Sequence, residues 1–84
     1  MKKIEWNALK NEQLKRTRGV SFEEIIEEEL VDILRHPIKT NQQILVYKHN
    51  DYCWAVPCVF EEDKYFLKTI YPSRKLTKKY LKKE

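Results

Sequence analysis

Cations and tyrosines are interspersed along the last part of the chain. From Lys68 to Glu84 there are seven bases and one acid, and the bases are Lys68, Arg74, Lys75, Lys78, Lys79, Lys82 and Lys83. Tyr71 and Tyr80 lie among them. Lysine and arginine bind phosphate, and aromatic rings stack on unpaired bases, so the segment is predicted to form one wall of an RNA site. A solvated helix face or a tail docked through its tyrosines has the same composition.

Four side chains, three in this segment and one earlier in the chain, could take part in cutting RNA without a metal ion. That reaction needs a base for the 2′-hydroxyl, a cation for the phosphorane and a donor for the leaving 5′-oxygen. Arg74 is the candidate cation because a guanidinium grips two phosphate oxygens. Lys68, expected at the centre of a strand and partly buried, is a candidate base or phosphate ligand, or alternatively a lysine that only extends along the sheet. His49 is a candidate acid or base, and Tyr80 could donate a proton or stack.

Five further side chains are predicted to bind RNA without chemistry: Lys75, Lys78, Lys79, Tyr71 and Lys48, the last on the same expected sheet face as Lys68. The acids lie elsewhere. Residues 20–34 carry six acids and no base, whereas residues 1–19 carry six bases and two acids. This acidic middle either orients an approaching nucleic acid or is an ordinary solvated surface.

The two cysteines and two histidines do not predict a metal site. Cys53 and Cys58 lie an odd number of residues apart in one expected strand, so they point to opposite faces and are expected to stay reduced. The spacing of His36, His49, Cys53 and Cys58 fits no familiar zinc pattern. We predict no metal and no cofactor.

Length and composition indicate one small domain spanning residues 1–84. The chain has 84 residues, of which 36% are charged, and a net charge of +4. A chain of this size buries about 60–65% of its unfolded surface, so the core is small. No apolar run approaches the roughly 20 residues that cross a bilayer, and the N-terminus lacks the apolar stretch of a signal peptide, so a cytoplasmic location and no membrane contact are predicted.

The first half predicts a strand, two helices and an ambiguous segment. Residues 3–6 alternate as a short edge strand, and Asn7 caps a helix that runs to about Arg18 and stops at Gly19. Ser21 and Glu24 form a capping box for a second helix, whose core side holds Phe22, Ile25, Ile26 and Leu30. Residues 30–36 either continue this helix or form a short strand, which we favour.

The second half predicts an antiparallel meander and a basic helix. Residues 44–49 and 52–60 form a hairpin around Asn50-Asp51, and residues 61–64 form a loop before a strand over 65–71. Pro57 indicates a bulge or an edge because it cannot donate to a ladder. Pro72 ends the last strand, and Ser73 caps a C-terminal helix.

These residues and their order resemble a known family. The segments that carry the likeness are Ile4-Glu5-Trp6-Asn7, the helix with Lys10, Arg18 to Glu24, the meander, and Pro72 to Lys79. They resemble the BrnT-type toxins of bacterial toxin–antitoxin pairs, in the RelE/ParE superfamily. Where those toxins tend to carry arginines along the last strand, this chain has Leu67, Lys68 and Thr69. Arg74 and Lys75 are the positions that carry over.

The resemblance implies a fold, an activity and a partner. The fold would be a small α+β domain with two N-terminal helices on an antiparallel meander sheet and a short basic C-terminal helix. The activity would be metal-independent cleavage of mRNA, silenced in a hetero-oligomer with an antitoxin, often a ribbon-helix-helix protein. Two alternatives stay open: a nucleic-acid-binding module that cuts nothing, and a structural subunit whose basic ends bind an acidic protein.

Overall fold

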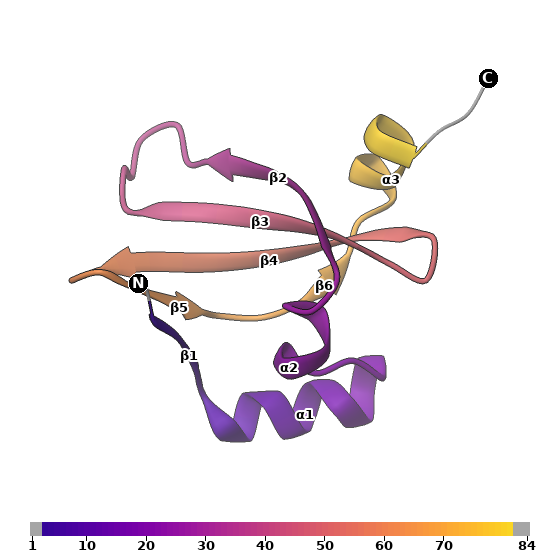
Figure 1. Ribbon diagram of the computed structural model, residues 1–84, viewed down its shortest axis with the longest axis horizontal. Helices are drawn as coiled ribbons and strands as arrows, with labels where there is room; N and C mark the ends of the chain where they lie inside the picture. The colour runs from indigo at the N-terminus through magenta and orange to yellow at the C-terminus, as the bar shows by residue number, and fades with distance from the viewer. Residues whose placement is uncertain (1–2, 82–84) are drawn as a thin grey trace.

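The computed structural model describes residues 3–81, which form a six-stranded sheet and three helices. The order along the chain is β1 (Lys3–Trp6), α1 (Ala8–Arg18), α2 (Phe22–Ile25), β2 (Glu29–Arg35), β3 (Gln42–His49), β4 (Tyr52–Glu61), β5 (Lys64–Leu67), β6 (Tyr71–Pro72) and α3 (Arg74–Leu81). Figure 1 shows α1 and α2 close together on one side of the strands and α3 at the far end of the sheet. The expected α+β class is confirmed.

The sheet is mixed, and here the prediction of a wholly antiparallel meander is wrong. The strand order is β1-β5-β4-β3-β2, with β6 paired to β4. Strands β2 to β6 pair antiparallel, whereas β1 pairs parallel with β5, for example Ile4 with Tyr65. The expected edge strand at residues 3–6 therefore forms, but its partner is a strand about sixty residues away, which no local pattern specifies.

Helix α1 has the predicted boundaries. The Asn7 side chain accepts a hydrogen bond from the Lys10 amide (2.9 Å). Gly19 adopts φ 69°, and its amide donates to the Lys15 carbonyl (3.2 Å). Glycine has no Cβ and adopts this left-handed conformation without a steric clash, so Gly19 ends the helix as expected.

The second helix is a single turn, much shorter than predicted. Its capping box between Ser21 and Glu24 is present, but the helix ends at Ile25. Leu30, expected on its core side, instead lies in β2 and is 45% exposed. The favoured strand over residues 30–36 is confirmed as β2, because pairing with β3 satisfies backbone groups that an isolated helical turn leaves open.

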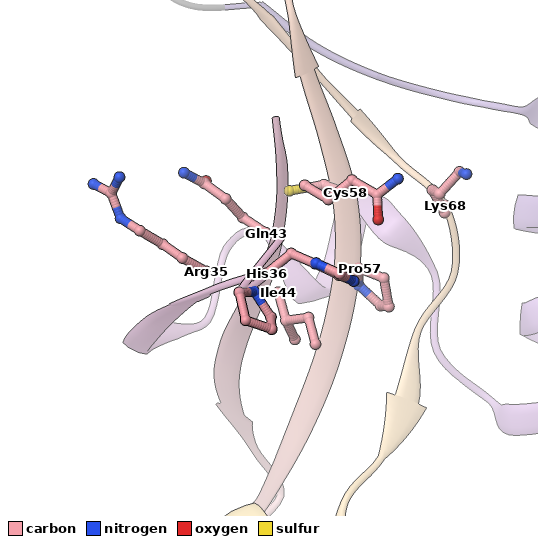
Figure 2. A pocket seen from close by; sticks show the side chains of 9 residues that line it. Arg35, His36, Gln43, Ile44, Pro57, Cys58 and Lys68 are labelled. Atoms are coloured by element: carbon pink, nitrogen blue, oxygen red, sulfur yellow. The ribbon is translucent and has the colours of Figure 1, made fainter. Parts of the chain in front are cut away.

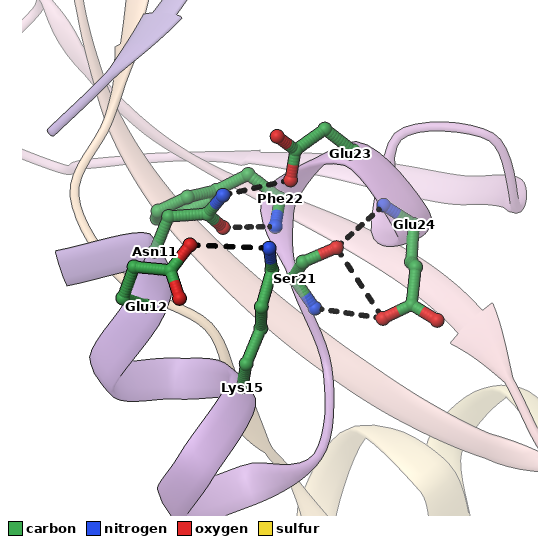
Figure 3. Close-up of polar contacts among 7 residues, drawn as sticks. All are labelled: Asn11, Glu12, Lys15, Ser21, Phe22, Glu23 and Glu24. Carbon is green, nitrogen blue, oxygen red and sulfur yellow. Dashed lines mark hydrogen bonds and ion pairs between the residues drawn. The ribbon is translucent and has the colours of Figure 1, made fainter. Parts of the chain in front are cut away.

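Buried Asn11 joins α1 to α2 (Figure 3). Its side-chain oxygen accepts from the Phe22 amide (2.8 Å), and its side-chain nitrogen donates to Glu23 (2.7 Å). Asn11 is only 4% exposed, and the bond from Asn11 lowers the pKa of Glu23. The burial of Asn11 was not predicted, since an asparagine inside a polar helix is usually exposed.

The central hairpin has the predicted register. Tyr47 pairs with Trp54, and Asn50 and Asp51 form the turn with φ of 54° and 59°. The next turn is tighter than the expected four-residue loop: Glu61 already pairs with Lys64, and the two residues between them take positive φ.

The strand predicted over residues 65–71 is broken in two, and Pro57 explains the break. The Lys68 amide donates to the Pro57 carbonyl (2.8 Å). A strand residue directs its amide and its carbonyl to the same neighbouring strand. Proline has no amide proton, so at Pro57 strand β4 offers no donor to a strand that would continue past Lys68. Residues 68–70 leave the ladder there, and the Arg18 guanidinium bonds to the Ile70 carbonyl in this loop.

The core lies between the helices and one face of the sheet. It consists of Leu14, Val20, Phe22, Ile25, Leu45, Tyr47, Val56, Cys58, Leu67 and Ile70. Val46, Cys53 and Ala55 are also buried, but strand alternation puts them on the other face. The two cysteines are free and lie on opposite faces, as predicted. Within residues 3–81 no helix is long and apolar enough to cross a membrane.

Candidate nucleic-acid interface

Helix α3 is fastened to the sheet at its first turn. Ser73 caps it by accepting from the Leu76 amide (3.1 Å), as predicted. The Ser73 amide donates to the Cys53 carbonyl (2.9 Å), and the Cys53 amide donates to the Thr77 hydroxyl (2.9 Å). Both backbone groups of Cys53 therefore bond to α3 or its cap, which fixes where the helix leaves the edge of β4.

A second attachment joins the end of α3 to β2. The Tyr80 hydroxyl donates to Asp32, whose other carboxylate oxygen accepts from the Ile33 amide (2.7 Å). The bond from Tyr80 lowers the pKa of Asp32, and the same bond raises the pKa of Tyr80. Asp32 was not among the predicted site residues, because it lies 48 residues from its partner.

Helix α3 carries four cations beside these attachments. Arg74, Lys75, Lys78 and Lys79 are all exposed, and their four-residue spacing forms two adjacent rows on the helix. The Lys79 ammonium lies 5.2 Å from the centroid of the Tyr80 ring, within the range of a cation–π interaction. The helix thus presents four positive side chains from a fixed base.

Two other predicted RNA-binding residues lie near this helix. Tyr71, 36% exposed, is in β6 and pairs with Ala55 of β4, just before α3 begins. Lys48 is half-buried in β3 and pairs with Cys53, to which Thr77 of α3 bonds. Tyr71, Lys48 and the four α3 cations are called the basic end below.

Lys68 does not have the predicted surroundings. It is exposed and follows the last residue of β5, so it is neither central on a strand nor partly buried. Lys68 lines a pocket, and none of the described residues of α3 lines the same pocket. The structure therefore does not bring Lys68 and Arg74 into one cavity.

His49 forms a pair with a carboxylate. Its Nδ1 lies 2.9 Å from the Glu28 carboxylate, its Nε2 lies 3.3 Å from the side-chain nitrogen of Asn50, and its ring meets the Trp54 ring edge-on with centroids 5.9 Å apart. Neighbouring strand residues point to opposite faces, so His49 is on the other face from Lys48. Glu28, which orients the ring, lies 21 residues away and was not among the predicted site residues.

The pocket beside Lys68 lies where β2 ends and β3 begins (Figure 2). Its volume is about 210 Å³. The apolar lining residues are Pro37, Ile44, Pro57 and Cys58, and the polar ones are Arg35, His36, Gln42, Gln43 and Lys68. Figure 2 shows the Arg35 side chain extending away from Lys68 and Cys58 pointing to the other side of β4 from Pro57. No acid is among these residues.

No group of three or more histidine, cysteine, aspartate or glutamate residues in the described part of the chain is arranged to hold a metal ion.

The comparisons with known proteins agree with the predicted resemblance in fold. No family model and no curated protein matches the chain. A solved structure does: the Brucella abortus ribonuclease toxin BrnT, whose crystal structure superposes with a TM-score of 0.57 over 87% of this chain and 97% of that one. This chain has a BrnT-like fold. The two sequences are 15% identical, so the likeness speaks for the fold and leaves the activity to be argued from the site.

Proposed function

We propose that the protein is the toxin of a toxin–antitoxin pair and that it cuts mRNA without a metal ion. The observation that carries the proposal is the fold similarity to a ribonuclease toxin, which spans 87% of the chain. The basic end supports it, because exposed cations on a firmly attached helix are suited to bind a phosphate backbone.

The residues divide into binding and chemical roles. The cations of α3 and Lys48 hold phosphates, and Arg74 steadies the charge that grows on the phosphorane. His49, oriented by Glu28, and Tyr80 are the candidate proton carriers. Lys68 is exposed and lines a pocket away from α3, so its part is to hold a phosphate of the same RNA strand rather than to act as a base.

Cleavage in EDTA tests the activity. An unstructured RNA should yield fragments ending in a 2′,3′-cyclic phosphate and a 5′-hydroxyl, the products of attack by the 2′-hydroxyl. Arg74→Ala should lower the rate by at least tenfold, whereas Lys15→Gln, on α1 and paired with Glu12, should leave it unchanged. Absence of these ends with an RNA that binds would refute the nuclease assignment.

An antitoxin partner is the second part of the proposal. Leu30 and Ile33 are 45% and 42% exposed on β2, an edge strand, and a partner chain that covers them would hide apolar surface. Co-expression with the product of an adjacent gene should give a complex that elutes as one species and cuts no RNA. A partner that leaves cleavage unaffected would contradict it.

A binding module without catalysis is the second candidate function. The observation in its favour is the spread of the candidate catalytic groups: Lys68 lines a pocket away from α3, and His49 lies on the other face from Lys48. RNA that binds with strong salt dependence but stays intact over hours would support this function. A flat salt response would instead indicate a structural subunit for an acidic protein.

A further inference from the structure

The pocket beside Lys68 has the size of one ring system. Its volume of about 210 Å³ is below the roughly 300–1,000 Å³ of pockets that hold drug-sized ligands. Ile44 and Pro57 supply apolar surface on the same sheet face, where they pair across β3 and β4. A flat heterocycle fits such a space, whereas a whole nucleotide does not.

One wall of the pocket is held in place by its own hydrogen bonds. The His36 Nδ1 accepts from the amides of Ile38 and Lys39, at 3.1 and 3.0 Å. The His36 amide also donates to the Gln42 carbonyl (3.1 Å), which closes the loop between β2 and β3. A wall formed before the ligand arrives needs little ordering on binding.

Polar groups suited to a base edge remain available at this wall. Because the Nδ1 of His36 accepts two amide protons, the proton of the neutral ring is on Nε2. Within residues 3–81, no hydrogen bond engages that Nε2 or the side-chain amide of Gln42. The His36 Nε2 offers a donor, and the Gln42 side-chain amide offers both a donor and an acceptor, as the edges of unpaired bases require.

The charge of the lining favours an anionic ligand. Lys68 is held at the pocket by the bond from its amide to the Pro57 carbonyl (2.8 Å), and none of the lining residues is an acid. A ligand with a phosphate beside a ring uses both the apolar surface and Lys68.

We propose that this pocket binds one unpaired nucleobase of the RNA. Ile44 and Pro57 pack on the ring, the His36 Nε2 and the Gln42 amide contact the base edge, and Lys68 binds an adjacent phosphate. The inference rests on the proposed function in taking RNA as the ligand, and it adds a subsite that selects the base away from the basic end.

Nucleoside monophosphates test the site on the full-length protein. AMP, GMP, CMP and UMP are titrated into ¹⁵N-labelled protein, with ribose 5-phosphate as the ligand that lacks a base. At least one nucleotide should shift the amides of Gln42 and Ile44 and bind at least fivefold more tightly than ribose 5-phosphate. Equal affinity for all five ligands, no binding at millimolar concentration, or shifts confined to α3 would overturn the proposal.

Two surface variants sharpen the test without disturbing the core. Lys68→Gln should weaken nucleotide binding about two- to fivefold, the effect of one exposed ion pair. Gln42→Ala should change the order of preference among the four bases and leave ribose 5-phosphate unaffected. The matched control Lys15→Gln, on α1 and paired with Glu12, should change neither. If Gln42→Ala leaves the order intact, or if pocket amides shift only with a protein partner, the site does not read a base.

The RNA cleavage assay on the same preparations separates this inference from the proposed function. Nucleotide shifts at the pocket without cleavage would leave the base site standing and remove the nuclease assignment. Cleavage without those shifts would remove the base site alone.

Discussion

The salt dependence of RNA binding can be calculated from the cations of α3. Each phosphate contact to a single strand contributes about −0.7 to the slope of log affinity against log salt. Arg74, Lys75, Lys78 and Lys79 are exposed on one helix, so their four contacts contribute about −2.8 to the slope. Between 50 and 200 mM salt the contribution of α3 should therefore lower the affinity about 50-fold.

Fluorescence anisotropy with a 2′-O-methylated RNA, which cannot be cut by its own hydroxyl, measures this slope. Changing any one of the four residues to glutamine should make the slope shallower by about 0.7, and changing all four should remove most of it. Lys15→Gln removes an equal charge from α1 and should leave the slope unchanged. If Lys15→Gln and Arg74→Gln change the slope equally, binding is a net-charge effect and α3 is not the interface.

Three further predictions concern stability and reactivity. Asn11→Ala should lower the free energy of unfolding by about 1–3 kcal/mol in urea titrations, since it leaves the buried Phe22 amide without an acceptor; a loss under about 0.5 kcal/mol would contradict this. Tyr80→Phe should speed hydrogen exchange in α3 at neutral pH. The lowered pKa of Asp32 and the raised pKa of Tyr80 mean that their bond stabilises the fold above the ordinary aspartate pKa and below the ordinary tyrosine pKa. That stabilisation is lost as pH falls through the lowered pKa of Asp32 or rises through the raised pKa of Tyr80. The exchange rates of wild type and variant, compared at the same pH, should therefore converge at both extremes. Burial raises the pKa of the Cys58 thiol, so Ellman's reagent should react much more slowly with native than with urea-unfolded protein; equal rates would show that the core is open.

Local signals predicted the elements whose causes are local. Asn7, Gly19 and the Ser21–Glu24 box act within three or four residues, and the Asn50-Asp51 turn sets the register of the strands on either side. The second helix was predicted too long because an apolar spacing over residues 22–30 cannot show that β3 offers a competing ladder.

The break at residues 68–70 shows the same limit from the other direction. Pro57 indicated an irregularity, but where it acts depends on which strand lies on its hydrogen-bonding side, and only the pairing of β4 with β5 decides that. Lys68 was therefore placed on the right sheet but in the wrong surroundings, exposed beside a pocket instead of central on a strand.

By itself the sequence determined the charge of the last helix, because composition and a capping serine specify a basic helix whatever it packs against. Only the tertiary structure decided what orients that helix and the histidine. Tyr80 meets Asp32 across 48 residues, and His49 meets Glu28 across 21. The order of strands in the sheet determines which distant residues become neighbours. These bonds depend on distance in space, and the spacing of residues along the chain does not specify that distance.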